Sequence, residues 1–258
     1  MATFLETVVE RTEADLKARK KAMPEASLRE RLGPARRGRP FSEALVDEGI
    51  SLIAEMKRAS PSRGPIRPEA SVGDIVGAYQ RAGASAVSVL TEPQWFGGSL
   101  DDLVAARAAC DLPLLRKDFV VDEYQMLEAR VAGADAVLLI VAALGRKRLA
   151  KLMAAAGELG MDALVEVHDE EEVRTAVDAG AEVIGINNRD LHSLEVDLAT
   201  TFHLLADIPA GTVVVAESGI TEPAQVEDLE AAGVDAILVG EALMRSDDPV
   251  RAVKDLLG

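Results

Sequence analysis

The sequence predicts an α/β fold of the (β/α)₈ barrel type with an N-terminal helical extension. From residue 51 onward, short apolar runs rich in β-branched residues alternate with amphipathic helical stretches. The runs are apolar almost throughout, which is typical of parallel strands buried on both faces. A second observation is a phrase built on Ala-Gly that recurs at 82–86, 132–136, 179–183 and 232–236. A doubly wound sheet is the alternative, but the chain has no Gly-x-Gly-x-x-Gly loop to favour it.

The four repeated phrases set the period of the fold. Their glycines are Gly83, Gly133, Gly180 and Gly233, spaced 50, 47 and 53 residues apart. Each spacing holds about two βα units, so eight units fill the chain. Each glycine is expected to end a helix in the left-handed conformation before the chain turns into a strand.

The elements follow this period in order. Strands are expected at 52–56, 86–90, 113–116, 136–141, 163–167, 183–186, 212–216 and 236–239. Helices are expected between them at 72–81, 100–109, 123–131, 146–159, 170–177 and 224–231.

The N-terminal segment lies outside this alternation. Residues 3–23 carry apolar side chains near helical spacing and predict one amphipathic helix that ends at Pro24. An Arg-rich connector to Pro40 and a short helical turn at 41–46 are expected next. We therefore expect a single domain over residues 1–258, in which 1–47 is the extension and 48–258 hold the eight βα units.

Composition excludes several classes of function. With 258 residues, 48% of them hydrophobic, the chain can bury a large core, and no apolar run is long enough to span a bilayer. The formal charge of -16 argues against a nucleic-acid partner. The N-terminus lacks the features of a signal peptide, and Cys110 is the single cysteine, so a reducing cytoplasm is expected. The three histidines have no ligand spacing, and no metal site is expected.

Polar side chains interrupt five of the predicted strands near their carboxyl ends, where a barrel of this kind places its active site. They are Glu55 and Lys57 on the first strand, Lys117 on the third, Glu166 on the fifth, Asn187 and Arg189 on the sixth, and Glu217 on the seventh. Burying these charges costs several kcal/mol unless each is paired or used. Their recurrence at one end predicts a catalytic site.

Two further features predict an anion there. Residues 55–67 carry four cationic side chains and one anionic one, in a chain that is otherwise strongly acidic. Gly219 and Gly240 follow the seventh and eighth strands, where loops and a short extra helix commonly bind phosphate in barrels. A short helix is expected to begin after Gly240.

The motifs at these strand ends resemble those of the indole-3-glycerol phosphate synthase family. The matching segments are 53–62, 115–119, 165–168, 185–191 and 216–220, in the family's order. The N-terminal helical extension is also similar, so the resemblance covers almost the whole chain. The loop after the eighth strand reads Gly240-Glu241, a position at which family members differ, and a backbone contact would survive either version.

The resemblance implies a reaction and a role for each residue. The family converts 1-(2-carboxyphenylamino)-1-deoxyribulose 5-phosphate to indole-3-glycerol phosphate, carbon dioxide and water, without a cofactor. Lys117 would be the general acid, Glu166 the general base, and Lys57 the partner of the substrate carboxylate and a candidate second acid. Glu55 and Glu217 would orient these lysines. The sequence leaves open which lysine donates its proton in which step.

The remaining candidates form the substrate pocket. Asn187, Arg189 and Ser218 would position the substrate, with Phe119, Trp95 and Phe96 around its aromatic ring. The phosphate would lie on Ser60, Gly219, Gly240 and Glu241. The partner expected is this phosphorylated small molecule, acted on by a monomer.

The sequence leaves two other functions open. One is a phosphate-binding isomerase of the same fold, although such barrels typically rely on a Cys/Asp or Asp/Asp pair rather than on Lys and Glu. The other is a non-catalytic barrel that only holds a phosphorylated ligand, for which Lys117 and Glu166 would be dispensable. Cys110, at the end of a predicted helix, is expected to be dispensable in every case.

Overall fold

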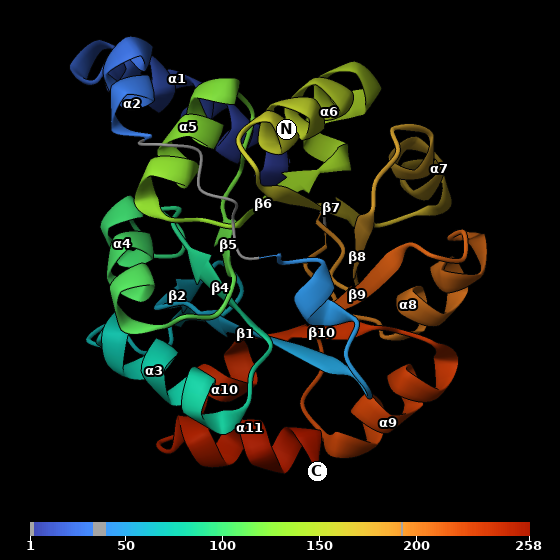
Figure 1. The fold of residues 1–258 in the computed structure, drawn as a ribbon. Helices are drawn as coiled ribbons and strands as arrows, with labels where there is room; N and C mark the ends of the chain where they lie inside the picture. The colour runs from blue at the N-terminus through green and yellow to red at the C-terminus, as the bar shows by residue number, and fades with distance from the viewer. Residues whose placement is uncertain (1–2, 33–39, 192) are drawn as a thin grey trace.

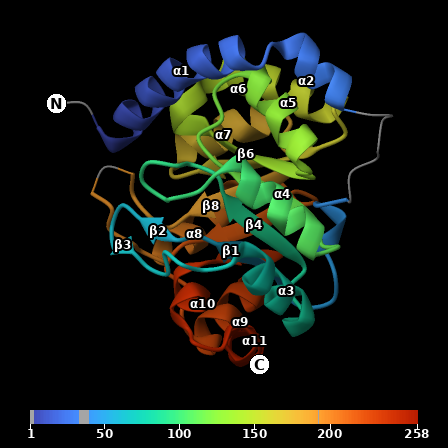
Figure 2. The same cartoon turned by 90° about the vertical axis from the view of Figure 1, so that its left-hand side faces the viewer.

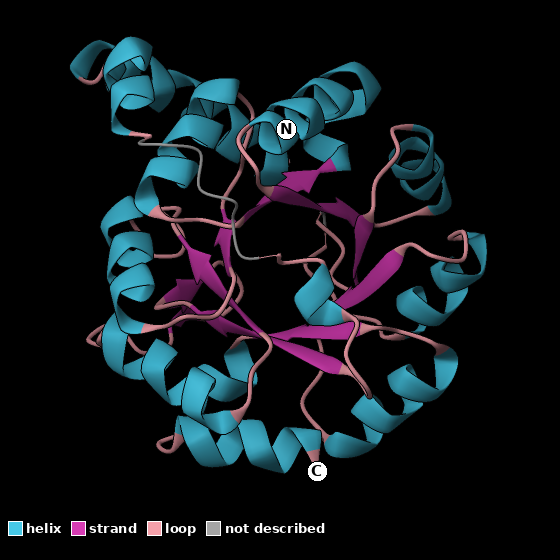
Figure 3. Ribbon diagram, viewed as in Figure 1, coloured by secondary structure: helices cyan, strands magenta, loops and turns pink. Residues whose placement is uncertain are grey.

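The computed structural model describes residues 3–32, 40–191 and 193–258, and these form a closed barrel of parallel strands surrounded by helices (Figures 1 and 3). The strands pair in the order β1-β10-β9-β8-β7-β6-β5-β4, and β4 closes the ring onto β1. Their bounds are β1 Ser51–Met56, β4 Ala86–Leu90, β5 Leu114–Lys117, β6 Ala136–Ile140, β7 Asp162–Val167, β8 Val183–Asn187, β9 Val213–Glu217 and β10 Ala236–Val239. The predicted barrel is confirmed.

Helices follow the strands and cover the outside of the ring. They are α3 Val72–Ala82, α4 Leu100–Ala109, α5 Glu123–Ala132, α6 Val141–Glu158, α7 Glu170–Asp178, α8 Ala199–Leu204, η2 Leu205–Asp207, α9 Pro223–Ala232, α10 Glu241–Arg245 and α11 Pro249–Leu257. The four glycines of the repeated phrase all have positive φ, between 80° and 99°, and lie at the ends of α3, α5, α7 and α9. None of the helices in the described residues is long and apolar enough to cross a membrane.

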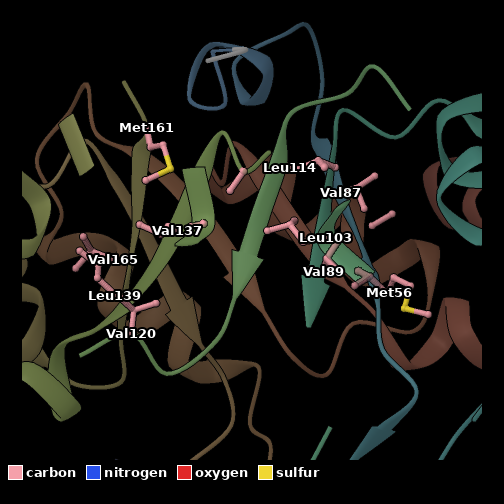
Figure 4. Packing of buried hydrophobic residues seen from close by; sticks show 14 of the residues in the cluster. Met56, Val87, Val89, Leu103, Leu114, Val120, Val137, Leu139, Met161 and Val165 are labelled. Atoms are coloured by element: carbon pink, nitrogen blue, oxygen red, sulfur yellow. The ribbon is translucent and has the colours of Figure 1, made fainter. Parts of the chain in front are cut away.

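Strand alternation divides the apolar side chains into two cores. One parity points into the barrel and includes Ile53, Leu115 and Leu164. The other parity points outward and packs beneath the helices, as Val87, Leu114 and Val137 do in Figure 4. Side chains filling both faces of the sheet explain why the strands read as nearly continuous apolar runs.

The N-terminal segment forms two helices rather than one helix and a connector. α1 spans Phe4–Ala22 and begins with a capping box between Thr3 and Glu6. α2 spans Glu25–Arg31, where no helix was expected. Pro24 ends the first helix and is the N-cap of the second, and the burial of Leu28 holds α2 on the barrel. Residues 33–39 of the predicted Arg-rich connector lie outside the described residues.

The extension packs along the side of the barrel near α5 and α6 (Figure 2). Arg19 of α1 lies 3.3 Å from the Glu128 carboxylate on α5, and the hydroxyl of Tyr124 donates to the carbonyl of Met23 at 2.7 Å. The 3₁₀ turn η1, Glu43–Leu45, then returns to the amino ends of the strands. There the N–H of Ser42 donates to Asp162, the first residue of β7.

Two local features differ from the predictions, and a third agrees with them. β2 Ala59–Ser60 and β3 Gly64–Pro65 form a small antiparallel hairpin after β1, where a loop was expected. The helix expected from residue 146 is preceded by one further turn, because α6 is broken at Gly145, which has a φ of 64°. The short α10 begins directly after Gly240, as predicted.

Candidate active site

The carboxyl ends of the strands open into a cavity of about 690 Å³. Inward parity places polar side chains at its floor, because Glu55 follows the inward Ile53, Lys117 follows Leu115 and Glu166 follows Leu164, each by two residues. The sequence-predicted residues that line the cavity are Glu55, Lys57, Ser60, Phe96, Lys117, Phe119, Glu166, Asn187, Arg189, Glu217, Ser218, Gly219, Gly240 and Glu241. The structure therefore brings together every predicted site residue except Trp95.

Trp95 lies one layer behind the cavity wall. Its ring packs edge-on against Phe4 of α1, with ring centroids 5.7 Å apart, and Phe4 itself lines the cavity. Phe4 also contacts Phe119 edge-on at 6.4 Å. The N-terminal helix thus supplies an apolar wall that strand-end reasoning could not place, because no strand motif includes Phe4.

The turn that carries Phe96 is fixed by a buried carboxylate. Glu92 accepts the backbone N–H groups of Gln94, Trp95 and Phe96, at 2.8, 2.7 and 3.1 Å. Because one side chain satisfies three donors, the loop after β4 is held in a single shape against the cavity.

Lys117 lies at the centre of the polar end of the cavity. Its Nζ is 3.5 Å from Oε2 of Glu166 and makes a closer contact with Oε2 of Glu217. Burial alone would lower the pKa of Lys117, but the carboxylates of Glu217, Glu166 and Glu55 outweigh burial and raise it. The ammonium form is therefore maintained inside the barrel.

The two carboxylates beside Lys117 differ in their environments. Burial alone would raise the pKa of Glu166, but the ammonium of Lys117 and a contact with His168 lower it to about 2. Burial raises the pKa of Glu217 to about 7, since the charges of Glu166 and Glu55 add to burial and outweigh the attraction of Lys117. Glu166 is thus the permanently ionised carboxylate, and Glu217 titrates near neutral pH.

A second ion pair occupies the β1 side of the cavity. Nζ of Lys57 lies 2.6 Å from Oε1 of Glu55. Burial opposes ionisation of Glu55, yet Lys57 and Lys117 together lower its pKa. The Glu55 side chain fits because Gly240 faces it, since a Cβ at Gly240 would overlap its carboxylate.

His168 lies behind Glu166 and was not predicted as a functional residue, although it ends the motif at 165–168. Its Nε2 is 3.3 Å from Oε1 of Glu166, and its Nδ1 is 3.0 Å from Oε2 of Glu172 on α7. The contact with Glu166 is an ion pair rather than an aligned hydrogen bond, because Nε2 has no partner of hydrogen-bond geometry.

Glycines and cations also line the cavity. Ser60, Gly219 and Gly240 line it together with Arg63, one of the four cations expected at 55–67, and with Arg245, which was not predicted. Both arginines pair with Glu241, at 3.2 and 3.3 Å. Backbone N–H groups beside glycine and nearby guanidinium groups are the donors that phosphate esters use in proteins.

The carboxyl end of β5 is anchored from outside the barrel. Arg116 has the opposite parity and is completely buried, donating to Thr91, to the carbonyl of Gln125 and to Asp118. Its guanidinium also lies 3.6 Å from Glu128, which pairs with Arg19 of α1. One buried network therefore joins β5 to the N-terminal helix.

Comparison with known proteins gives one consistent result. The family model described as indole-3-glycerol phosphate synthase matches residues 5–256. The chain is 51% identical over 258 residues to "Indole-3-glycerol phosphate synthase 2" of Streptomyces coelicolor, covering 100% of both chains. It is 49% identical over 257 residues to the "Indole-3-glycerol phosphate synthase" of Beutenbergia cavernae, covering 99% of this chain and 95% of that one.

Solved structures show the same fold at low sequence identity. A mutant tryptophan synthase α-subunit from Pyrococcus furiosus superposes with a TM-score of 0.62 at 16% identity, covering 81% of this chain and 98% of that one. The thiamine phosphate pyrophosphorylase from Pyrococcus furiosus superposes with a TM-score of 0.59 at 19% identity, covering 80% of this chain and 93% of that one.

Proposed function

Because the chain belongs to the indole-3-glycerol phosphate synthase family, we propose that its cavity closes, decarboxylates and dehydrates 1-(2-carboxyphenylamino)-1-deoxyribulose 5-phosphate. The products are indole-3-glycerol phosphate, carbon dioxide and water, so the chain is a carboxy-lyase. One observation carries the assignment of roles: the Lys117 ammonium lies between the carboxylates of Glu166 and Glu217 at the polar end of the cavity.

Ring closure requires a proton donor. As the aromatic carbon that bears the carboxylate attacks the ketone carbon, a carbon–carbon bond forms and the ketone oxygen takes up a proton. Lys117 supplies it, since its ammonium form is stabilised by three carboxylates. Loss of carbon dioxide leaves its bonding electron pair in the ring, which neutralises the iminium and restores aromaticity.

Dehydration requires a base and an acid together. Glu166 takes a proton from the new five-membered ring. Its low pKa keeps the buried carboxylate ionised, so it is always in the form that can accept a proton. The hydroxyl leaves as water when a nearby ammonium protonates it. Lys117 and Lys57 both line the cavity and are the two candidates for this acid.

The other residues that line the cavity bind the substrate. Lys57 pairs with the substrate carboxylate, and Glu55 and Glu217 orient the lysines. Asn187, Arg189 and Ser218 hold the sugar portion, while the aromatic ring lies against Phe96, Phe119 and Phe4. The phosphate binds at Ser60, Gly219, Gly240 and the backbone of Glu241, all of which line the cavity.

We also infer that a single copy of the chain is sufficient and that it works in the cytoplasm. The candidate acid, base and phosphate positions all come from one chain. A phosphorylated sugar derivative carries too much charge to cross a lipid bilayer unaided, so its conversion is expected where it is made.

The direct test mixes the purified protein with the carboxyphenylamino-deoxyribulose phosphate in the presence of EDTA and follows indole fluorescence. Turnover that persists with the chelator is the expected result. Binding without turnover would favour a barrel that only holds the ligand. No binding would reject the assignment and favour an isomerase.

Glu166→Gln should bind the substrate with nearly unchanged affinity but turn over slowly. A large loss of affinity would instead make Glu166 a binding residue.

A further inference from the structure

We propose that His168 is a positioning residue for Glu166: its imidazolium, held in place by Glu172, fixes the orientation and the charge of the candidate base. This inference rests on the proposed function, because it assigns a task to Glu166 in that reaction. Three observations support it: Glu172 contacts the ring at Nδ1, the ring lies next to the Glu166 carboxylate, and His168 does not line the cavity.

Glu172 fixes the histidine through two donors. Its Oε2 accepts the backbone N–H of His168 at 2.8 Å and lies 3.0 Å from the ring Nδ1. Glu172 is itself anchored, because its N–H donates to the N-cap side chain Asp169 at the start of α7. The ring therefore cannot rotate without breaking a contact to a helix terminus.

The same contacts define the charge of the ring. With a carboxylate at Nδ1, that nitrogen must carry a proton, since only an N–H can donate to it. Nε2 faces a second carboxylate, Oε1 of Glu166 at 3.3 Å, where an unprotonated nitrogen would place two lone pairs against each other. Burial disfavours the charged ring, but Glu166 and Glu172 outweigh burial and raise the pKa of His168 to about 10.

The charged groups around this pair come from five elements. Glu166 of β7 and Glu172 of α7 face the ring. On the cavity side, the charges of Lys117 of β5, Glu217 of β9 and Glu55 of β1 act on Glu166. Glu166 therefore lies between two cations, one of which reaches the substrate space. His168 does not line the cavity, so it acts on the reaction only through Glu166.

This arrangement explains how Glu166 stays ionised although it is buried beside two other carboxylates. Lys117 alone is shared among Glu55, Glu166 and Glu217. The imidazolium of His168 is a second cation that contacts only Glu166 of these three, and it lowers the pKa of Glu166 relative to that of Glu217. Near neutral pH a shared proton is therefore held by Glu217, and Glu166 stays unprotonated.

The test replaces the ring by a neutral side chain. His168→Gln retains an N–H donor of similar reach but has no charge. We expect the acid-side pKa of kcat to rise by about one unit or more, with KM unchanged because His168 does not contact the substrate. Below that pKa, kcat falls about tenfold for each unit of the rise. Glu172→Gln should give a smaller shift in the same direction.

The matched control is His203→Gln. His203 also pairs with a carboxylate of α7, Glu170 at 3.1 Å, but both side chains are exposed and neither lines the cavity. Its pH profile should match the wild type. A wild-type pH profile in His168→Gln, or a loss of kcat that is equal at every pH, would overturn the proposal.

A second measurement needs neither a variant nor turnover. The ¹⁵N shifts of the His168 side chain in the wild-type protein at about pH 8 should show both ring nitrogens protonated. A neutral ring at that pH would overturn the proposal even if every variant failed to fold. Because this measurement needs no substrate, it also separates failure of the His168 proposal from failure of the proposed reaction.

Discussion

Gly185 leaves the space that the side chain of Glu217 fills. The two residues lie on neighbouring strands, and a Cβ at Gly185 would overlap Oε1 of Glu217. Glu217 is almost fully buried and holds its other oxygen against Lys117. Because Gly185 has no side chain, Glu217 can occupy the position from which it contacts the Lys117 ammonium.

Replacing this glycine should move the carboxylate without changing any charged residue. In Gly185→Ala, the methyl group displaces Glu217 and misaligns Lys117, so we expect kcat to fall by about a hundredfold, the order of loss that a displacement of about 1 Å can cause. Gly157→Ala is the matched control, since its Cβ would contact nothing within 4 Å. The control should keep full activity and gain up to about 1 kcal/mol of stability from helix propensity. Full activity in Gly185→Ala would contradict the role given to this contact.

Removing the candidate acid should be more severe. Lys117→Ala is expected to lower turnover by at least the roughly 10²–10⁴-fold typical of a general acid. Steady-state kinetics with circular dichroism as the fold check measures this. Lys151→Ala, which removes an exposed lysine paired with Glu123 on the helix surface, serves as the control and should behave as wild type. If Lys117→Ala kept near-wild-type turnover with the fold intact, another group would have to be the acid.

The raised pKa of Glu217 has a consequence for stability. The folded protein keeps this proton up to about pH 7, while the unfolded chain loses it near the ordinary value of 4.5. Between these values the folded state binds more protons, so the contribution of Glu217 to stability falls as the pH rises through that window. Glu217→Gln removes the titration. The unfolding free energy of this variant, relative to wild type, should therefore increase from pH 5 to pH 8 in urea titrations, and a constant difference would exclude the raised pKa.

The buried guanidinium of Arg116 should matter more to folding than any surface ion pair. Arg116→Met leaves Asp118 and Glu128 as buried carboxylates without their main partner, which typically costs about 3–5 kcal/mol. Arg146→Met removes an exposed pair with Asp178 and should change stability by less than about 1 kcal/mol. Chemical denaturation of both variants gives the comparison, and equal effects would refute the structural role of the Arg116 network.

Cys110 should be dispensable. It ends α4 with its side chain buried, and it does not line the cavity. Cys110→Ser is expected to retain wild-type turnover in the indole fluorescence assay. Loss of turnover with an unchanged circular dichroism spectrum would show that the thiol has a catalytic role.

The strand positions were predictable because burial on both faces leaves a strong apolar signal, and the repeated glycines gave the period. Lys117, Glu166 and Glu217 were predictable as neighbours because the carboxyl ends of parallel strands meet at one end of a barrel. These inferences need only local sequence and the fold. Their catalytic roles stay predictions until the variants are measured.

The residues that sequence reasoning missed owe their places to long-range packing. Phe4 reaches the cavity only because α1 docks on the barrel, and Trp95 lies behind it for the same reason. Arg116 was passed over because a charge beside Lys117 offers no sign that it faces outward into a buried network. His168 carried a local signal, since Glu172 follows it at a spacing of four residues, which suits a histidine anchored at the start of a helix.

The position of Phe4 has a practical consequence for handling the protein. α1 begins at a residue that forms part of the cavity wall, whereas α11 ends away from α1 in both views (Figures 1 and 2). An affinity tag or fusion partner joined ahead of α1 would emerge beside the entrance used by the substrate. The same addition after Gly258 would leave that entrance clear, so recombinant versions intended for kinetics should carry their tags at the carboxyl end.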